Sequence, residues 1–266
     1  MTIRRWRRRV LRSSAVLGVA AVLVTLAACS SGGSDKSSSS SSSGFSASVG
    51  TPGPAASVPV GDPAKEIVAV DGLVVSEKSF NDELNAIGSV PSYLDATDLQ
   101  LTPSNIATRL PQGGFDPGYV RLLLRRRVLL AVVEHELAVR NVPVSDTCTQ
   151  AATAHLAEAL SGDLDEGNAF LAAFPQSYRD QLIVWNAEVR ELQAQLSGLA
   201  CDTADPSAQD KIGTAYATWL DATLATANIA IEPSYGIWDA SSGTILPPGG
   251  LAVTTTPRTG SSASGG

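Results

Sequence analysis

The sequence predicts a mainly α-helical fold in which one small β element joins the two ends of the folded region. Between residues 63 and 240, apolar side chains recur at helical spacing over most of the chain. Only residues 66–75 and 228–231 have the β-branched composition of strands. Because neither segment is long enough to be stable alone, we expect the first to pair with the last, beside a helical bundle.

A β-hairpin and a helix are expected at the start of this region. Residues 66–70 end at Asp71-Gly72, a pair typical of a tight turn, and residues 73–75 continue as the second strand. Ser76 then offers a side chain that can cap a helix reaching residue 87. The apolar residues of that helix share one face: Phe80, Leu84 and Ile87.

Five further helices are predicted, separated by short breaks. Residues 91–117 hold four prolines and a Gly-Gly pair, so we expect a long loop there with one short helical turn. An acidic turn is expected at residues 162–167. The expected helices cover residues 118–141, 145–160, 168–174, 177–198 and 207–227.

Three consecutive arginines interrupt the helix over residues 118–141. The middle of this helix is apolar on nearly all sides, which predicts a central position in the fold. Arg125, Arg126 and Arg127 cannot share one helix face, because successive residues point about 100° apart. We interpret them as side chains whose stems cover the core and whose charged heads reach water, in preference to an anion-binding site.

Residues 1–28 are predicted to be the signal peptide of an exported lipoprotein. An arginine-rich start precedes an apolar run over residues 15–28, which as a helix spans about 21 Å, less than the ~30 Å membrane core. The run ends in Leu26-Ala27-Ala28-Cys29, which resembles a bacterial lipobox. The resemblance implies diacylglycerol on the Cys29 thiol, cleavage before this residue, and N-acylation with a fatty acid such as palmitate. These chains would anchor the protein on the extracytoplasmic face of the cell membrane. The alternative is an ordinary signal peptide with a chance cysteine.

Segments of low complexity flank the folded region. Residues 29–62 are dominated by Ser, Gly, Ala, Pro and Thr, and we expect them to form a disordered tether behind the lipidated Cys29. Residues 241–266 have a similar composition and are expected to form a disordered tail. The folded domain is therefore predicted to cover residues 63–240.

The charge distribution argues against nucleic-acid binding. The formal net charge is −7, but six of the 19 Lys and Arg residues lie in the first twelve positions. Behind Cys29, the remaining 13 basic residues face 26 acidic ones, a balance of −13. Such a surface repels nucleic acid, whose binding requires clustered Lys and Arg to displace counterions.

Two cysteines remain once Cys29 carries lipid. Cys148 and Cys201 lie beside predicted helices of an exported domain, the environment in which disulfides persist. We expect a disulfide between them, which would stabilise the fold by about 4 kcal/mol through loop closure. The alternative is two buried free thiols.

No residue pattern predicts an active site. A zinc-protease helix needs His at both ends of H-E-x-x-H, but Val139 stands where the second His would follow His135. The acidic stretch at 163–168 does not match a calcium loop, because Phe174 stands at the closing position. We therefore expect no catalytic residue, metal or cofactor, and interpret His135 and His155 as surface or capping residues.

Apolar residues of the long helices are the candidates for peptide binding. Such residues at helical spacing usually form core, yet a seam that is only half covered would accept unfolded segments. The helical stretches 119–137, 178–196 and 212–224 are the expected source of this seam. The candidate peptide-binding residues are Tyr178, Leu182, Trp185, Tyr216 and Trp219.

Three segments resemble, in the same order, one family of chaperones. Residues 70–76 (VDGLVVS) resemble the opening motif of SurA and PrsA, with aspartate where asparagine is usual. Residues 129–138 and 141–146 resemble their next helix and the break behind it, with asparagine at the usual glycine. Residues 219–239 resemble the closing segment of actinobacterial SurA-like lipoproteins. The resemblance covers most of residues 65–239.

The resemblance implies an extracytoplasmic chaperone or foldase whose N-terminal helices and C-terminal segment form one module of the SurA N-terminal-domain type. Many relatives carry a parvulin domain between those parts, which isomerises X-Pro bonds. Here residues 145–201 are predicted to be helical and lack a β-rich, Gly-rich parvulin pattern. We therefore do not expect prolyl isomerase activity, and we do not expect an enzyme.

These observations lead to one main hypothesis and two alternatives. The main hypothesis is an ATP-independent, lipid-anchored chaperone that binds unfolded, newly exported proteins in an apolar cleft between its helices. The first alternative is an interaction lipoprotein that serves one partner in the cell envelope. The second is a degenerate prolyl isomerase. Besides such proteins, the membrane is the only partner expected, through the lipid anchor.

Overall fold

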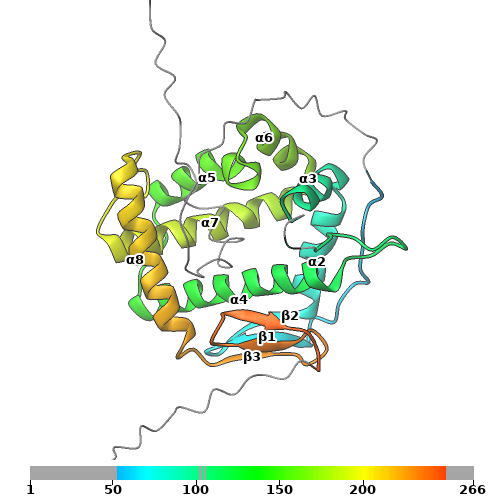
Figure 1. Ribbon diagram of the computed structural model, residues 1–266. Helices are drawn as coiled ribbons and strands as arrows, with labels where there is room; N and C mark the ends of the chain where they lie inside the picture. The colour runs from blue at the N-terminus through cyan, green and yellow to red at the C-terminus, as the bar shows by residue number, and fades with distance from the viewer. Residues whose placement is uncertain (1–52, 102–103, 105, 250–266) are drawn as a thin grey trace, which may run out of the picture. The chain divides into compact units, whose positions relative to one another are not determined.

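The computed structural model describes residues 53–101, 104 and 106–249, and the chain forms two compact units. The helical unit, as we call it, covers Pro143–Trp219, and the mixed unit is formed by Pro52–Val142 and Leu220–Gly266 as far as these are described. Seven helices hold 59% of the described residues, together with a small antiparallel sheet (Figure 1). The predicted mainly α class is therefore confirmed.

Several predicted features lie outside the described residues. These are the signal peptide, the lipidated Cys29, the tether as far as residue 52 and the tail from residue 250. Within the part of the chain that is described, no helix is both long enough and apolar enough to cross a membrane.

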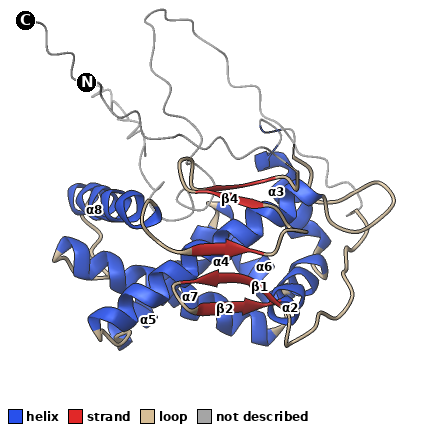
Figure 2. Ribbon diagram, turned by 90° about the horizontal axis from the view of Figure 1, so that it is seen from below, coloured by secondary structure: helices blue, strands red, loops and turns tan. Residues whose placement is uncertain are grey.

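The two ends of the folded region meet in a three-stranded antiparallel sheet. β1 (Glu66–Val70) is the central strand, between β2 (Leu73–Ser76) and β3 (Ile229–Ile231) (Figures 1 and 2). This arrangement confirms the predicted pairing of the first extended segment with the last. The register of β1 with β3 is Val68 with Ile231, Ala69 with Ala230, and Val70 with Ile229.

Asp71 and Gly72 turn the chain between β1 and β2. Their φ angles are 47° and 93°, the left-handed conformation that a tight hairpin turn requires, so the Asp-Gly prediction is confirmed. The Asp71 N–H donates to the Asn228 carbonyl (3.1 Å), and the Asn228 N–H donates to Asp71 Oδ1 (3.0 Å). The same turn thus holds the residue that precedes β3.

α2 (Glu77–Gly88) begins where predicted, because the Ser76 hydroxyl accepts a hydrogen bond from the Ser79 N–H (3.2 Å). Its apolar face is buried as predicted. Gly88 at its end has no room for a side chain, since a Cβ there would lie 1.8 Å from the Ala56 carbonyl oxygen. The chain before β1 therefore passes directly over this helix.

Residues 53–62 correct the predicted tether, because they are ordered along α2. Ala56 is buried, although this stretch has no large apolar side chain to signal packing other than two valines. Backbone groups make most of the contacts, which composition does not reveal. Three hydrogen bonds hold the segment: Ala56 N to Gly88 O (3.2 Å), Val58 N to Asn85 Oδ1 (2.9 Å), and Asn81 Nδ2 to Pro59 O (3.0 Å).

α3 (Pro91–Leu101) contradicts the long loop predicted over residues 91–117. Pro91 is the first residue of this helix and Pro117 is the first residue of the next one. At a first helical position the missing proline N–H breaks no hydrogen bond. Two of the four prolines therefore mark helix starts and were wrongly interpreted as loop signals.

α4 (Pro117–Arg140) is the long central helix that was predicted, and it packs on β1 and β2 (Figure 1). The Asp116 carboxylate caps its start by accepting a hydrogen bond from the Gly118 N–H (2.6 Å). Asn141 ends it in the left-handed conformation, with φ of 54°. Its buried apolar residues include Leu123, Leu124, Val128, Leu129, Val132 and Val133.

The three consecutive arginines of α4 do not send their charged heads into water, which corrects the sequence interpretation. Arg125 is 7% exposed, and its Nε donates to the Gly243 carbonyl (2.5 Å). Arg126 pairs with Glu83 of α2, and Arg127 Nε lies 3.6 Å from the second oxygen of the same carboxylate. A buried acidic residue on another helix explains the difference, and helix periodicity alone does not reveal such a partner.

The helical unit contains α5 (Asp146–Ser161), α6 (Leu164–Ala173), α7 (Gln176–Ser197) and most of α8 (Pro206–Leu224). α5 packs on α6 and α7. α5 and α7 end near the predicted residues, because Gly162 and Gly198 follow them in the left-handed conformation. The prediction of consecutive helices between Ser145 and Cys201 is confirmed.

α6 begins four residues earlier than predicted. The Asp163 carboxylate accepts a hydrogen bond from the Glu166 N–H (2.9 Å), so most of the expected acidic turn is the first turn of this helix. Gly167 allows α6 to lie against α5, because a Cβ at this position would be 1.9 Å from the Ala157 carbonyl oxygen.

A second hairpin lies beyond the predicted end of the fold. β4 (Ile237–Asp239) pairs with β5 (Thr244–Leu246), and Ile245 is buried. The boundary at residue 240 and the disordered tail from residue 241 are therefore wrong as far as Leu246. β5 has only three apolar or β-branched residues, flanked by Ser, Gly and Pro. Such a short run does not show the alternation of apolar and polar residues by which a strand is recognised in a sequence.

Candidate functional site

The five candidate peptide-binding residues belong mostly to the core. Tyr178, Leu182 and Trp185 of α7 are buried, as is Tyr216 of α8, and Trp219 is half-buried. Burial raises the pKa of the Tyr216 phenol, as expected in apolar surroundings. Four of the five side chains therefore stabilise the interior and do not form an open seam.

Edge-to-face ring contacts connect two aromatic residues of α7 with each other and with Phe174 at the end of α6. The ring centroids of Phe174 and Tyr178 are 5.2 Å apart, and those of Tyr178 and Trp185 are 6.3 Å apart. Tyr216 and Trp219 form a separate pair with centroids 5.6 Å apart. Such pairs add about 0.5–1.5 kcal/mol beyond the burial of area, which fits a structural role.

Cys148 and Cys201 form a disulfide within the helical unit, with Cα atoms 5.1 Å apart. Cys148 is fully buried in the first turn of α5, where its N–H donates to the Ser145 hydroxyl (3.2 Å). Cys201 lies between α7 and α8. The bond ties the start of α5 to the connection behind α7, across a sequence separation of 53 residues.

Glu191 places a buried carboxylate beside the disulfide. Oε2 accepts a hydrogen bond from the Ser145 N–H (2.9 Å), and Oε1 accepts one from the Gln195 amide (3.0 Å). Burial opposes ionisation, but these hydrogen bonds outweigh it and lower the pKa of Glu191. A carboxylate oxygen and both cysteine sulfurs lie within 4.8 Å of one another, although the disulfide occupies the sulfurs.

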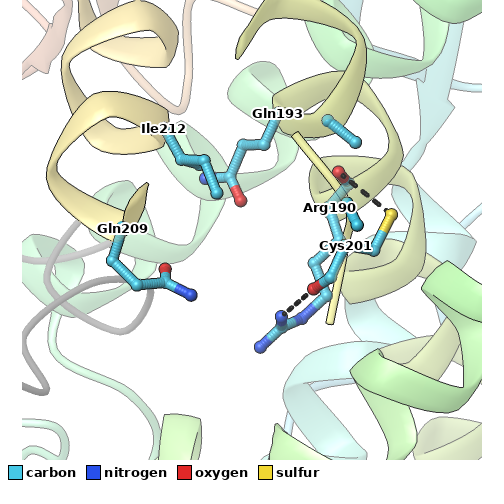
Figure 3. Close-up of a pocket in the computed structure, with 7 residues that line it drawn as sticks. Arg190, Gln193, Cys201, Gln209 and Ile212 are labelled. Atoms are coloured by element: carbon cyan, nitrogen blue, oxygen red, sulfur yellow. Dashed lines mark hydrogen bonds between the residues drawn. The ribbon is translucent and has the colours of Figure 1, made fainter. Parts of the chain in front are cut away.

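A small polar pocket opens next to Cys201 (Figure 3). We call it the α7–α8 pocket, because its walls come from the end of α7, the following connection and the start of α8. The pocket is small: its volume of about 10 Å³ accepts one water molecule or one oxygen atom of a ligand. The lining residues are Arg190, Gln193, Ala194, Ala200, Cys201, Gln209 and Ile212.

Three side chains turn polar ends toward this shared space (Figure 3). Arg190 Nη1 donates to the Cys201 carbonyl (3.2 Å), and the Gln209 amide donates to the Thr203 carbonyl (2.5 Å). Gln193 is 5% exposed and its side-chain amide makes no hydrogen bond to residues 53–101, 104 and 106–249, but the amide is not sealed off and water in the pocket can reach it. The pocket therefore contains unused hydrogen-bonding capacity.

The guanidinium of Arg190 has no carboxylate in direct contact within the described chain. Burial lowers the pKa of Arg190, and Glu158 opposes this only through its charge, without a hydrogen bond. Arginine stays protonated in proteins, so the site holds a partly dehydrated positive charge. An anionic oxygen in the pocket would be stabilised by that charge.

The sequence pointed to Cys201 as a disulfide partner and to Ile212 as an apolar residue of the 212–224 stretch, but to none of the polar residues of this site. Arg190, Gln193, Gln209 and Glu191 are isolated polar residues on amphipathic helices, and neither their type nor their spacing forms a motif. The one signal in the sequence is that Glu191 and Gln193 flank Leu192, an apolar residue of the predicted helix. In the structure all three of these consecutive residues of α7 are buried. The histidines lie elsewhere, with His135 half-buried on α4 and His155 exposed on α5.

Comparisons with known proteins identify no relative. No family model matches the chain, and neither a curated protein nor a solved structure is similar to it.

Proposed function

We propose that this protein is an ATP-independent chaperone of the extracytoplasmic membrane face, anchored by lipid on Cys29 and without a prolyl isomerase domain. It would bind unfolded, newly exported proteins and prevent their apolar segments from aggregating. The tether would hold the folded units away from the lipid surface.

The pairing of β1 with β3 is the observation that carries this proposal. The SurA and PrsA resemblance implies one module built from N-terminal helices and a C-terminal segment. In this chain, β3 lies beside β1 with three residue pairs in antiparallel register, and the Asp71 turn holds the residue before β3. The first and the last of the three segments that carry the resemblance are therefore neighbours in the mixed unit.

The helices of the helical unit support a chaperone without isomerase activity. α5, α6 and α7 occupy residues 146–197, the stretch in which many SurA and PrsA proteins, which this sequence resembles, carry a parvulin domain. This favours the main hypothesis over the degenerate prolyl isomerase.

The outer edge of β2 is the proposed place for an extended client segment, because the aromatic candidates are buried. In the sheet order β2-β1-β3, no strand of the described chain pairs with that edge. Val74 on β2 is 48% exposed and offers an apolar contact. Backbone hydrogen bonds to an added strand are the same for every client sequence, which suits broad recognition.

The test is suppression of aggregation by the purified lipoprotein, with a chemically unfolded exported protein as client. Val74→Lys protects the edge with a charge, and Leu99→Lys places the same charge at an exposed apolar residue of α3. We expect the wild type and Leu99→Lys to suppress light scattering at several-fold molar excess, and Val74→Lys to lose most of the effect. No suppression by the wild type would overturn the chaperone proposal, and full activity of Val74→Lys would overturn the β2 edge.

A further inference from the structure

We propose that the α7–α8 pocket is a binding site for a carboxylate group, held by Arg190, Gln193 and Gln209. This site lies within the helical unit, and its function does not depend on the chaperone activity or on the β2 edge.

Arg190 brings a positive charge to the pocket without a carboxylate in direct contact in the described chain. Its one hydrogen bond within the described chain goes to a backbone carbonyl, that of Cys201 (3.2 Å). A backbone carbonyl orients a guanidinium but does not neutralise it. The remaining N–H groups of the planar fork match the two oxygens of a carboxylate.

The side-chain amide of Gln193 makes no hydrogen bond to another described residue. The residue is 5% exposed, and the amide is left open to the pocket, where water or a ligand can reach it. Figure 3 shows this amide turned into the space that Gln209 and Arg190 also face. Because neither end of the amide is engaged, it can rotate to present its N–H to a ligand without losing a bond.

The size and surroundings of the pocket favour a carboxylate over a phosphate. The space accepts about one oxygen atom, so a ligand must insert an edge and leave its remainder in solvent. Glu158 acts on Arg190 through its charge, and a dianion would be repelled more strongly than a monoanion. A planar monoanion satisfies both conditions.

The disulfide prepares the site for binding. The Cys201 carbonyl that orients Arg190 belongs to a residue whose sulfur is bonded to Cys148 in α5. The position of the guanidinium is therefore set before a ligand arrives, which reduces the entropy lost on binding.

The experiment titrates the purified lipoprotein with three probes and follows the side-chain amide signals of Gln193 and Gln209 by NMR. The probes are sodium acetate, a short N-acetylated peptide with a free C-terminal carboxylate, and the same peptide with a C-terminal amide. Sodium chloride at equal ionic strength is the salt control. Shifts with acetate alone identify small carboxylates as the source, and shifts with both acids extend the site to polypeptide C-termini.

Three variants separate the site from the fold. Arg190→Gln removes the charge, and Gln193→Met removes the amide at similar volume. Arg179→Gln removes an arginine of α7 that does not line the pocket. We expect at least about tenfold weaker binding for the first two and a change below about twofold for the third. Equal shifts with chloride or the amidated peptide, or unchanged affinity of a folded Arg190→Gln or Gln193→Met variant, would overturn the proposal.

Discussion

Glu83 pairs with two arginines in the interior of the mixed unit. Its side chain is 3% exposed and lies between Arg126 and Arg127, whose side chains are 11% and 14% exposed. Removing one member of a buried ion pair is costly, because the remaining charges stay dehydrated.

Glu83→Gln should therefore lower the free energy of unfolding by about 3–5 kcal/mol, measured by urea denaturation. The matched control is Glu136→Gln, which breaks the more exposed pair with Arg140 on the surface of α4. It should cost less than about 1 kcal/mol. Similar losses in the two variants would show that burial of the Glu83 network has no energetic effect.

Glu191 should make stability depend on pH. Hydrogen bonds from Gln195 and Ser145 outweigh burial and lower its pKa in the folded state. A carboxyl group with a lowered folded pKa stabilises the fold above its unfolded pKa, about 4.3, and loses this contribution as the pH falls through the folded value.

Glu191→Gln should therefore be less stable than the wild type at pH 7, by about 1–3 kcal/mol, and the difference should shrink below about pH 4. Thermal unfolding between pH 7 and pH 3 measures both effects. A constant difference over this range would contradict the proposed role of the charge. Glu134→Gln, at an exposed position of α4, should keep the wild-type curve.

Residues that act through local backbone geometry were predictable from the sequence. Ser76 and Ser145 cap helices, Asn141 adopts the left-handed conformation, and Asp71-Gly72 forms the turn. Each depends on neighbours within a few positions. Gln193 and Glu83 owe their environment to residues on other elements, which a single sequence does not place.

The Cys148–Cys201 disulfide connects elements that would otherwise separate on unfolding. It joins the first turn of α5 to the connection behind α7. In the chain-entropy model, closing a loop of this length restricts the unfolded state and adds about 4 kcal/mol.

The double variant Cys148→Ala/Cys201→Ala should accordingly lose about 4 kcal/mol of unfolding free energy. Urea denaturation of the wild type with and without dithiothreitol gives an independent measurement, and reductant should not affect the variant. A midpoint that reduction leaves unchanged would contradict a stabilising role of this bond.

Long amphipathic elements were predictable, whereas short or proline-rich ones were not. α4, α5 and α7 have enough turns for the apolar period to show, and their ends follow from caps. α3 was hidden by prolines that begin helices, and β5 is only three residues long. The early start of α6 depends on one cap, Asp163, within an acidic stretch that also suits a turn.

The mixed unit depends on contacts between the two ends of the folded region. It is formed by described residues up to Val142 and from Leu220 onward, so it is complete only when the last described segment has returned to the first. The sequence predicted this return because each extended segment was too short to be stable alone. The α7–α8 pocket had no such signal, since its polar residues come from two helices and a connection.

The two ends of the folded region close on each other through β1 and β3. Cross-strand nuclear Overhauser effects in the purified protein test this closure. We predict contacts between backbone protons of residues 68–70 and 229–231, in the antiparallel register of Val68 with Ile231 and Val70 with Ile229. A well-folded protein in which these residues show no cross-strand contact would contradict the claim.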